Sequence, residues 1–395
     1  MIVDELRIIG STQTNVVMEA ELIRVAQRAV KQRPPKPRKE GLGQLVFPFD
    51  RDLAWAAVTY MRTPTRVVWD LYRSRATRLE ALYDDLVADI SEDQRTLWRD
   101  GDGISVEARR VDEFAAGERQ VVGTVKNALI DTLARRGTRL HVDPERPATR
   151  WVARMDDNGE VVVSIDLGGG SLSQRGWRQE TGEAPLREHL AAVLLMLARF
   201  DSRKDVLVDP MCGSGTIPIE AVHLARATPR PTPALAALGI RHVSPDATSL
   251  ETPPLYADAA PLVIGCDIDL DVLAAARDNA RAARVAEQIT WQRADVATLT
   301  PSIIGDIAQE RGRERPETGL ILSNPPYGER LAEQDLRILY TALAHTCVKF
   351  RGWRAAFIVG NPLLEETFFH ILGRPRIKKP LANANLRAYF YLYEL

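Results

Sequence analysis

The chain has 395 residues, which is long for one domain and predicts two or three. Hydrophobic residues make up 45% and charged residues 27%, a globular composition that excludes a disordered, collagenous or coiled-coil protein. The longest apolar run, residues 190–198, is far shorter than the roughly 20 residues that cross a bilayer, so we expect no membrane partner. Because the formal net charge is −1, any polyanion would have to bind a local basic patch.

The cysteines and histidines show no ligand or disulfide pattern. Cys212, Cys266 and Cys347 lie far apart with no CxxC pair, and no two histidines have HxxxH spacing. The N-terminal residues carry acids where a signal peptide carries positive charge. We therefore predict a reduced, cytoplasmic protein without a disulfide framework or a metal ion.

The first 170 residues mix helical and strand patterns. Apolar spacing predicts helices over 17–31, 53–61, 78–90 and 123–136, and strands over 45–49, 67–72, 103–109, 149–155 and 161–167. Asp156–Asp157–Asn158–Gly159 joins the last two strands and is a strong hairpin signal. This mixture predicts a compact α+β module.

A basic, proline-rich segment interrupts that module. Its cations, with no acid among them, are Lys31, Arg33, Lys36, Arg38 and Lys39. The proline content favours a solvated, semi-rigid linker over a polyanion contact.

From about Gly182 onward, strands alternate with helices. We predict helices over 186–200 and 336–348, and strands over 206–208, 262–265, 289–299, 320–322, 354–360 and 386–395. A proline-dense stretch occupies residues 228–261. The alternation predicts an α/β fold with a parallel, doubly wound sheet.

Chemistry is expected where these strands end. Asp209-Pro210-Met211-Cys212-Gly213-Ser214-Gly215-Thr216 follows an apolar strand and opens a helix, so its glycines would let backbone approach an anionic ligand at the helix start. Alone, this segment is equally consistent with a plain tight turn. Asp267 and Asp295 follow the next two strands. An acid there can accept ribose hydroxyls or an adenine amino group, and the succession predicts an adenosine-bearing cofactor at a sheet switch point.

The segment Asn324-Pro325-Pro326-Tyr327, after the strand at 320–322, is the most specific signal. The amine of a nucleobase is a poor nucleophile because its lone pair is delocalised into the ring. The Asn324 side-chain oxygen and the Pro325 carbonyl, fixed by locked proline φ angles, can accept its two N–H bonds and orient it for attack on a methyl group. Tyr327 offers a ring on which an unstacked base can lie. The alternative is a purely structural role, in which the segment forms a rigid proline turn with a packed tyrosine.

Together, DPMCGSGT, CDID and NPPYGERL resemble the class I S-adenosylmethionine-dependent methyltransferases that modify guanine N2 in RNA. The chain is most similar to the THUMP-domain group, which includes the bacterial 23S ribosomal RNA guanine-N2-methyltransferases. Further matches are Gly176-Trp177-Arg178 and the segment from Gly182 to Glu188, and the resemblance covers about residues 65–395. It implies a Rossmann-like methyltransferase domain at residues 186–395.

The resemblance also implies the remaining organisation. Residues 1–65 would form an N-terminal α/β extension with a ferredoxin-like part, residues 66–170 a THUMP-like RNA-binding domain, and residues 171–185 a linker. It places the base at Asn324, Pro325, Pro326 and Tyr327, the catalytic residues. It assigns S-adenosylmethionine to Asp209, Met211, Cys212, Gly213, Gly215, Thr216, Asp267, Ile268, Asp295, Val296 and Asn324. The RNA contacts that we expect are Lys126, Arg135, Arg136, Arg139, Arg175 and Arg178, the first four on or just after one helix.

Three functions remain in competition. An RNA guanine-N2-methyltransferase is favoured, with ribosomal RNA ahead of transfer RNA and no obligate protein partner. A DNA adenine-N6 methyltransferase would use the same hydrogen-bond logic, but we find no target-recognition segment after Pro326. A non-catalytic RNA-binding protein is disfavoured by the intact motifs.

Overall fold

The computed structural model describes residues 1–178, 186–240, 252–327, 332–383 and 386–395. Contacts divide the chain into two compact units. Unit 1 comprises residues 1–10, 18–172 and 229–253, and unit 2 comprises residues 11–17, 173–228 and 254–395. Gly182–Pro185 of the predicted linker and Gly328–Leu331 after Tyr327 lie outside the described residues.

Unit 1 is built on an eight-stranded sheet. Its strands are β1 (Ile2–Ile9), β2 (Arg38–Glu40), β3 (Gln44–Pro48), β4 (Arg66–Ser74), β5 (Gly103–Arg109), β6 (His141–Val142), β7 (Thr149–Met155) and β8 (Val161–Asp166). The order across the sheet is β2-β3-β1-β4-β8-β7-β5-β6. Strands of the predicted N-terminal extension and of the predicted THUMP-like domain therefore share one sheet, because β1 pairs antiparallel with β4.

The hairpin predicted from its turn is confirmed. β7 and β8 pair antiparallel from Arg150↔Asp166 to Met155↔Val161. The turn between them places Gly159 at φ 78°, a conformation that glycine adopts at no steric cost. β5 runs parallel to β7, so the chain needs a crossover between them, and a helix supplies it.

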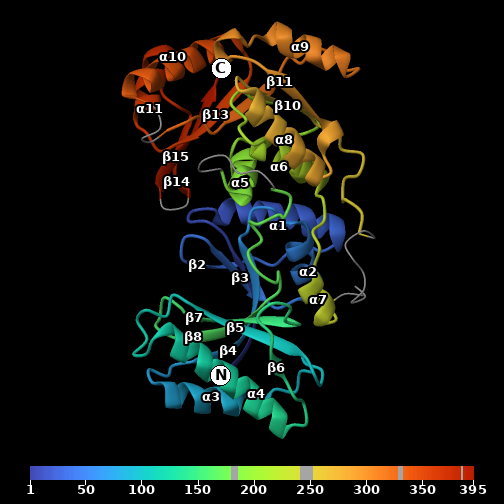
Figure 1. Ribbon diagram of the computed structural model, residues 1–395, viewed down its shortest axis with the longest axis vertical. Helices are drawn as coiled ribbons and strands as arrows, with labels where there is room; N and C mark the ends of the chain where they lie inside the picture. Colours follow the sequence, from blue (N-terminus) through green and yellow to red (C-terminus); the bar gives the residue numbers. More distant parts are fainter. Residues whose placement is uncertain (179–185, 241–251, 328–331, 384–385) are drawn as a thin grey trace. The chain divides into compact units, whose positions relative to one another are not determined.

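The helices of unit 1 are α1 (Asn15–Ala29, which begins in unit 2), α2 (Arg51–Tyr60), α3 (Leu79–Glu92), α4 (Glu118–Arg135) and α7 (Pro233–Ala237). Helices α3 and α4 lie side by side on one face of the sheet (Figure 1). Helix α3 buries Leu82, Leu86 and Ile90, one helical turn apart, which is why the sequence predicted an amphipathic helix there.

A network of charges crosses the sheet of unit 1. Asp70 on β4 is fully buried and accepts hydrogen bonds from Arg7 Nε at 2.8 Å, Arg154 Nη2 at 2.7 Å and Ser164 Oγ at 2.6 Å. These partners come from β1, β7 and β8. Because each buried charge has an opposite charge beside it, the network ties four strands together without leaving an unpaired carboxylate.

Unit 2 contains a seven-stranded sheet, and it confirms the predicted Rossmann-like α/β fold. Its strands are β9 (Val206–Asp209), β10 (Leu262–Asp267), β11 (Ile289–Arg293), β12 (Gly319–Ser323), β13 (Arg354–Val359), β14 (Ile377–Asn383) and β15 (Leu386–Glu394). The order is β11-β10-β9-β12-β13-β15-β14. The first five are parallel, and β15 and β14 close the sheet as an antiparallel hairpin.

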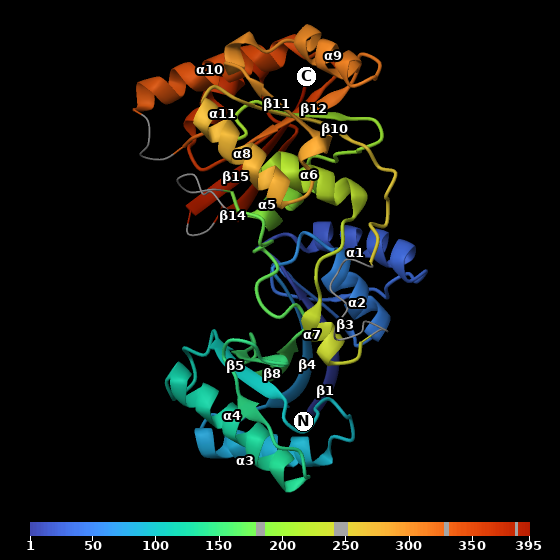
Figure 2. The same ribbon diagram turned by 45° about the vertical axis from the view of Figure 1, so that its right-hand side comes forward.

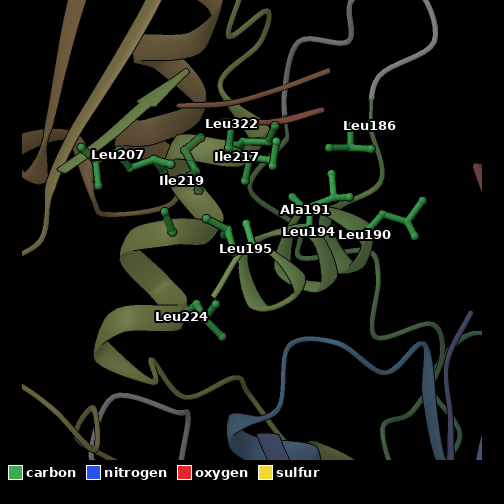
Figure 3. Packing of buried hydrophobic residues seen from close by; sticks show 14 of the residues in the cluster. Leu186, Leu190, Ala191, Leu194, Leu195, Leu207, Ile217, Ile219, Leu224 and Leu322 are labelled. Carbon is green, nitrogen blue, oxygen red and sulfur yellow. The ribbon is translucent and has the colours of Figure 1, made fainter. Parts of the chain in front are cut away.

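Helices cover both faces of this sheet (Figure 2). One face carries α5 (Glu188–Leu197), α6 (Thr216–Arg226) and α8 (Leu270–Ala282). The other face carries α9 (Pro301–Glu310), α10 (Glu333–Lys349) and α11 (Leu363–Leu372). Two short 3-10 helices among the described residues, Ala286–Gln288 and Val296–Thr298, flank β11. Leu207 packs with Ile217 and Ile219 on the face that α5, α6 and α8 cover (Figure 3). Its neighbours Val206 and Val208 pack on the opposite face, under α9, α10 and α11. A strand buried on both faces explains the uninterrupted apolar run.

Part of the proline-dense stretch groups with unit 1, although the sequence placed it within the domain at 186–395. Arg230 donates its backbone N–H to the Thr59 carbonyl and its Nη2 to the Val58 carbonyl, both at 2.9 Å. Helix α7 follows with Pro233 in its first turn. Among the described residues, no helix is both long and apolar enough to span a membrane.

Candidate active site

The predicted site residues meet at one edge of the sheet of unit 2. Asp267 and Asp209 are the last residues of β10 and β9, Asn324 directly follows β12, and Asp295 comes two residues after β11. These strands are parallel neighbours, so their carboxyl ends lie along the same edge. The chain leaves β9 for β10 on one side, and β12 pairs with β9 on the other, which makes this edge a topological switch point.

The glycine-rich loop between β9 and α6 is shaped by two different constraints. Gly215 has φ 85°, and a Cβ there would lie 2.7 Å from the Trp291 ring, so no side chain fits. Gly213 has φ 52°, but a Cβ there would meet no atom within 4 Å. The backbone at Gly213 therefore has open space on its Cβ side, which leaves room for a ligand beside the loop.

Asp267 connects this loop to β10. Its Oδ2 accepts the Gly213 N–H at 3.0 Å, and its Oδ1 accepts the Asp269 N–H at 3.1 Å. Each carboxylate oxygen has a second lone pair, so Asp267 can still accept two hydroxyl groups from a ligand. Ile268 beside it is 60% exposed and offers an apolar surface next to those oxygens.

Asp209 is buried beneath the loop. Burial raises the pKa of its carboxyl to about 7, although the Ser323 hydroxyl, which donates at 2.7 Å, and the Met211 N–H, at 3.3 Å, act in the opposite direction. Burial also raises the pKa of the Cys212 thiol and brings that of Cys266 to about 12. Both thiols stay protonated at neutral pH, which argues against a thiolate nucleophile.

Asn324 carries an unsatisfied group. Its Oδ1 is buried and has no hydrogen-bond partner among the described residues. An unpaired buried oxygen costs about 1–3 kcal/mol, so this atom is suited to accept a hydrogen bond from a ligand. Pro325, Pro326 and Tyr327 follow it at the sheet edge.

The remaining predicted cofactor residues lie along the same edge. Asp295 is exposed and its carboxylate caps the next turn by accepting the Ala297 N–H at 2.9 Å, while Val296 is buried. Met211 is half-buried. Thr216 begins α6, as the sequence predicted.

Two arginines predicted to contact RNA have internal partners instead. The Arg175 side chain is 2% exposed and pairs with the fully buried Glu220 at 3.3 Å. Arg178 donates to Glu188 at 3.1 Å and to the Thr216 hydroxyl at 3.0 Å. Since the guanidinium charges are neutralised inside unit 2, we assign both residues a structural role in place of the predicted RNA contact.

The four basic residues at α4 differ from one another. Arg136 donates to the carbonyls of Ile90 and Asp93, and Arg139 pairs with Asp100 at 3.4 Å. Lys126 is half-buried on α4, and Arg135 is exposed at the end of the helix.

Sequence reasoning missed two residues that support the site. Ser323 holds the Asp209 carboxylate, and Asn279 on α8 is fully buried and donates Nδ2 to the Ser214 carbonyl at 3.1 Å. The place of Ser323, directly before the NPPY segment, was an available signal. Nothing local distinguished Asn279, because its partner lies 65 residues away in the sequence.

Comparison with known proteins fits this geometry. A family model described as "RMKL-like, methyltransferase domain" matches residues 175–379. The chain belongs to this family. A relative named ribosomal RNA large subunit methyltransferase K/L from Aeromonas salmonicida (strain A449) is 37% identical over 259 residues, which cover 61% of this chain and 35% of the relative. The protein of the same name from Chromohalobacter salexigens is 32% identical over 349 residues, which cover 79% of this chain and 43% of that relative. The match thus spans less than half the length of each of these relatives.

Solved structures share the fold of the RMKL-like chain. The crystal structure of SMU.472 complexed with SAH matches with a TM-score of 0.76 at 22% identity, and the match covers 100% of this chain and 98% of that chain. TrmN from Thermus thermophilus matches with a TM-score of 0.66 at 21% identity, and the match covers 99% of this chain and 100% of that chain.

Proposed function

We propose that this chain transfers a methyl group from S-adenosylmethionine to the exocyclic N2 of a guanosine in RNA, with 23S ribosomal RNA the favoured substrate. The observation that carries the proposal is the buried Asn324 Oδ1, which has no hydrogen-bond partner among the described residues and lies at the same sheet edge as the Asp267-anchored glycine loop. The name of the relatives supports ribosomal RNA over transfer RNA.

The described residues fit the cofactor. Asp267 would accept the ribose hydroxyls, the loop from Asp209 to Thr216 would line the methionine end, and Asp295 would accept the adenine amino group. The exposed side chain of Ile268 would cover one face of the adenine. When bound, the cofactor supplies a sulfonium-activated methyl group.

The protein contributes orientation to the reaction. The Asn324 Oδ1 and the Pro325 carbonyl would each accept one N–H of the guanine amine, which aims the nitrogen lone pair at the methyl carbon. With the cofactor held by Asp267 and the loop from Asp209 to Thr216, methyl transfer to that nitrogen would leave the C–S electron pair on sulfur, and the methylated amine would lose one proton to solvent. Tyr327 would stack on the base that has left its strand.

We further propose that residues 66–170 act as a THUMP-like RNA-binding domain, preceded by the extension at 1–65 and joined by the linker at 171–185 to the methyltransferase domain at 186–395. Lys126 and Arg135 on α4 remain its candidate phosphate contacts. Because the substrate would be intracellular RNA, we also propose a cytoplasmic location and no obligate protein partner.

Transfer of a labelled methyl group tests the proposed function. Purified chain and labelled S-adenosylmethionine would be incubated with ribosomal RNA, transfer RNA and DNA from a strain that lacks the gene, and the products digested to nucleosides. We expect labelled N2-methylguanosine from the ribosomal fraction, formed about 100-fold or more slowly by the Asn324→Ala variant. Label in transfer RNA alone would show that transfer RNA, and not ribosomal RNA, is the substrate. Labelled N6-methyladenosine from DNA would refute the proposal.

A further inference from the structure

Helix α10 reaches the NPPY segment with one hydrogen bond. Tyr340 on this helix is fully buried, and its hydroxyl donates to the carbonyl oxygen of Pro326 at 2.8 Å. Burial raises the pKa of the Tyr340 hydroxyl, so it keeps the proton that it donates. The Pro326 carbonyl belongs to the peptide plane that leads into Tyr327. Fixing the direction of that carbonyl therefore fixes the point from which the Tyr327 side chain departs.

A second constraint acts on the Tyr327 ring. Gly360 directly follows β13, and a Cβ built there would lie 3.2 Å from Cδ2 and Cε2 of Tyr327. The same Cβ would lie 3.0 Å from the carbonyl oxygen of Arg387. That oxygen is backbone of β15, and Arg387 is paired with Ala382 of β14, so it yields less readily than a side chain would. A side chain at residue 360 would therefore press on the Tyr327 ring, which would have to move by a few tenths of an ångström to make room.

From these two contacts we infer that Tyr340 and Gly360 are positioning residues for the target base. Tyr340 fixes the backbone that precedes Tyr327, and Gly360 leaves the space in which its ring lies. The inference rests on the proposed function, because it assumes that a flipped base stacks on Tyr327. A displacement of about 1 Å costs on the order of 100-fold in rate, so smaller shifts of the ring should be visible in the methyl-transfer step.

The first test removes the Tyr340 hydroxyl alone. We expect Tyr340→Phe to lower the single-turnover rate of methyl transfer to RNA by about tenfold, with the Kd for S-adenosylhomocysteine changed less than twofold. Tyr393→Phe is the matched control, because that buried hydroxyl in the same unit has no hydrogen-bond partner among the described residues. A purely structural role for Tyr340 would lower the melting temperature and leave the rate of the folded enzyme unchanged.

The second test is a double-mutant cycle. Gly360→Ala should slow methyl transfer about tenfold in the wild-type chain but less than twofold in a Tyr327→Ala background, where there is no ring to displace. Gly123→Ala on α4 is the control substitution, since a Cβ there meets nothing within 4 Å. S-adenosylhomocysteine binding would verify that each variant is folded.

The outcomes separate this inference from the proposed function. If the wild-type chain methylates RNA guanosine but Tyr340→Phe and Gly360→Ala match their controls, the positioning role is overturned and the function stands. An equal loss from Gly360→Ala with and without the Tyr327 ring would also overturn it. If the wild-type chain transfers no methyl group to guanosine, the proposed function fails and the inference fails with it.

Discussion

Asp267 offers the sharpest test of the cofactor site. Its two carboxylate oxygens each accept one backbone N–H, at 3.0 and 3.1 Å, and each has one lone pair left for a ribose hydroxyl. Replacement by alanine removes both acceptors and also releases Gly213 from β10. Because the side chain is half-buried and water competes for the hydroxyls, we expect a loss of about 1–3 kcal/mol, or roughly 5- to 150-fold in Kd for S-adenosylhomocysteine.

Titration calorimetry would measure this affinity for wild type and variants. Asp267→Asn keeps an acceptor oxygen but turns an amide N–H₂ toward one of the two N–H donors, so its affinity should fall between wild type and Asp267→Ala. Asp278→Ala is the matched control, since that exposed acid on α8 pairs with Arg281 alone among the residues that the structure describes. Wild-type affinity in Asp267→Ala would refute the assignment of ribose to this carboxylate.

Three further predictions follow from the described contacts. Asn324→Ala should slow single-turnover methyl transfer by about 100-fold or more, a much larger loss than in S-adenosylmethionine affinity, and Asn324→Asp should retain part of the rate; normal turnover in the alanine variant would exclude this segment as the active site. Asp70→Ala leaves the buried Arg154 guanidinium without an acidic partner among the described residues and leaves Arg7 with Glu40 alone. Urea unfolding should show a loss of about 3–5 kcal/mol, whereas a loss below about 1 kcal/mol would contradict the role given to the network. Neutralising Lys126 and Arg135 together should reduce the salt dependence of RNA binding, and an unchanged slope would remove α4 from the RNA interface.

Local patterns predicted the elements whose signals are contained within a few residues. The hairpin at Asp156–Gly159, the start of α6 at Thr216 and the doubly wound strands all depend on turn chemistry, helix spacing or apolar runs. Strand β1 went unpredicted because its acids and Arg7 break the expected alternation of a half-buried strand. The buried Arg7 is compensated by Asp70, 63 residues away, and no local pattern contains that partner.

The same limit explains which site residues were misassigned. The residues at the strand ends could be predicted because parallel strands place them at one edge whatever the loops between them do. Arg175 and Arg178 have the composition of a surface linker, and only the tertiary structure brings Glu220 and Glu188 to their guanidinium groups. Helix α9 was not predicted, but for a different reason. Its Thr300–Pro301 N-terminus and the spacing of its isoleucines are local signals that the sequence does contain.

Asp209 links the site to pH. Burial raises its pKa from 3.8 to about 7 in the folded chain, so the folded state holds a proton that the unfolded state releases above about pH 4. Its contribution to stability is therefore complete below pH 4, and is lost as pH rises toward 7, by a few kcal/mol in all. Asp209→Asn cannot ionise but still accepts the Ser323 hydroxyl. The free energy of unfolding of the variant, relative to that of wild type, should rise from pH 5 to pH 7 and level off above pH 7. It would be measured in the unfolding transition that moves when S-adenosylhomocysteine is added. A stability difference that is constant across this range would show that Asp209 is already ionised in the folded protein.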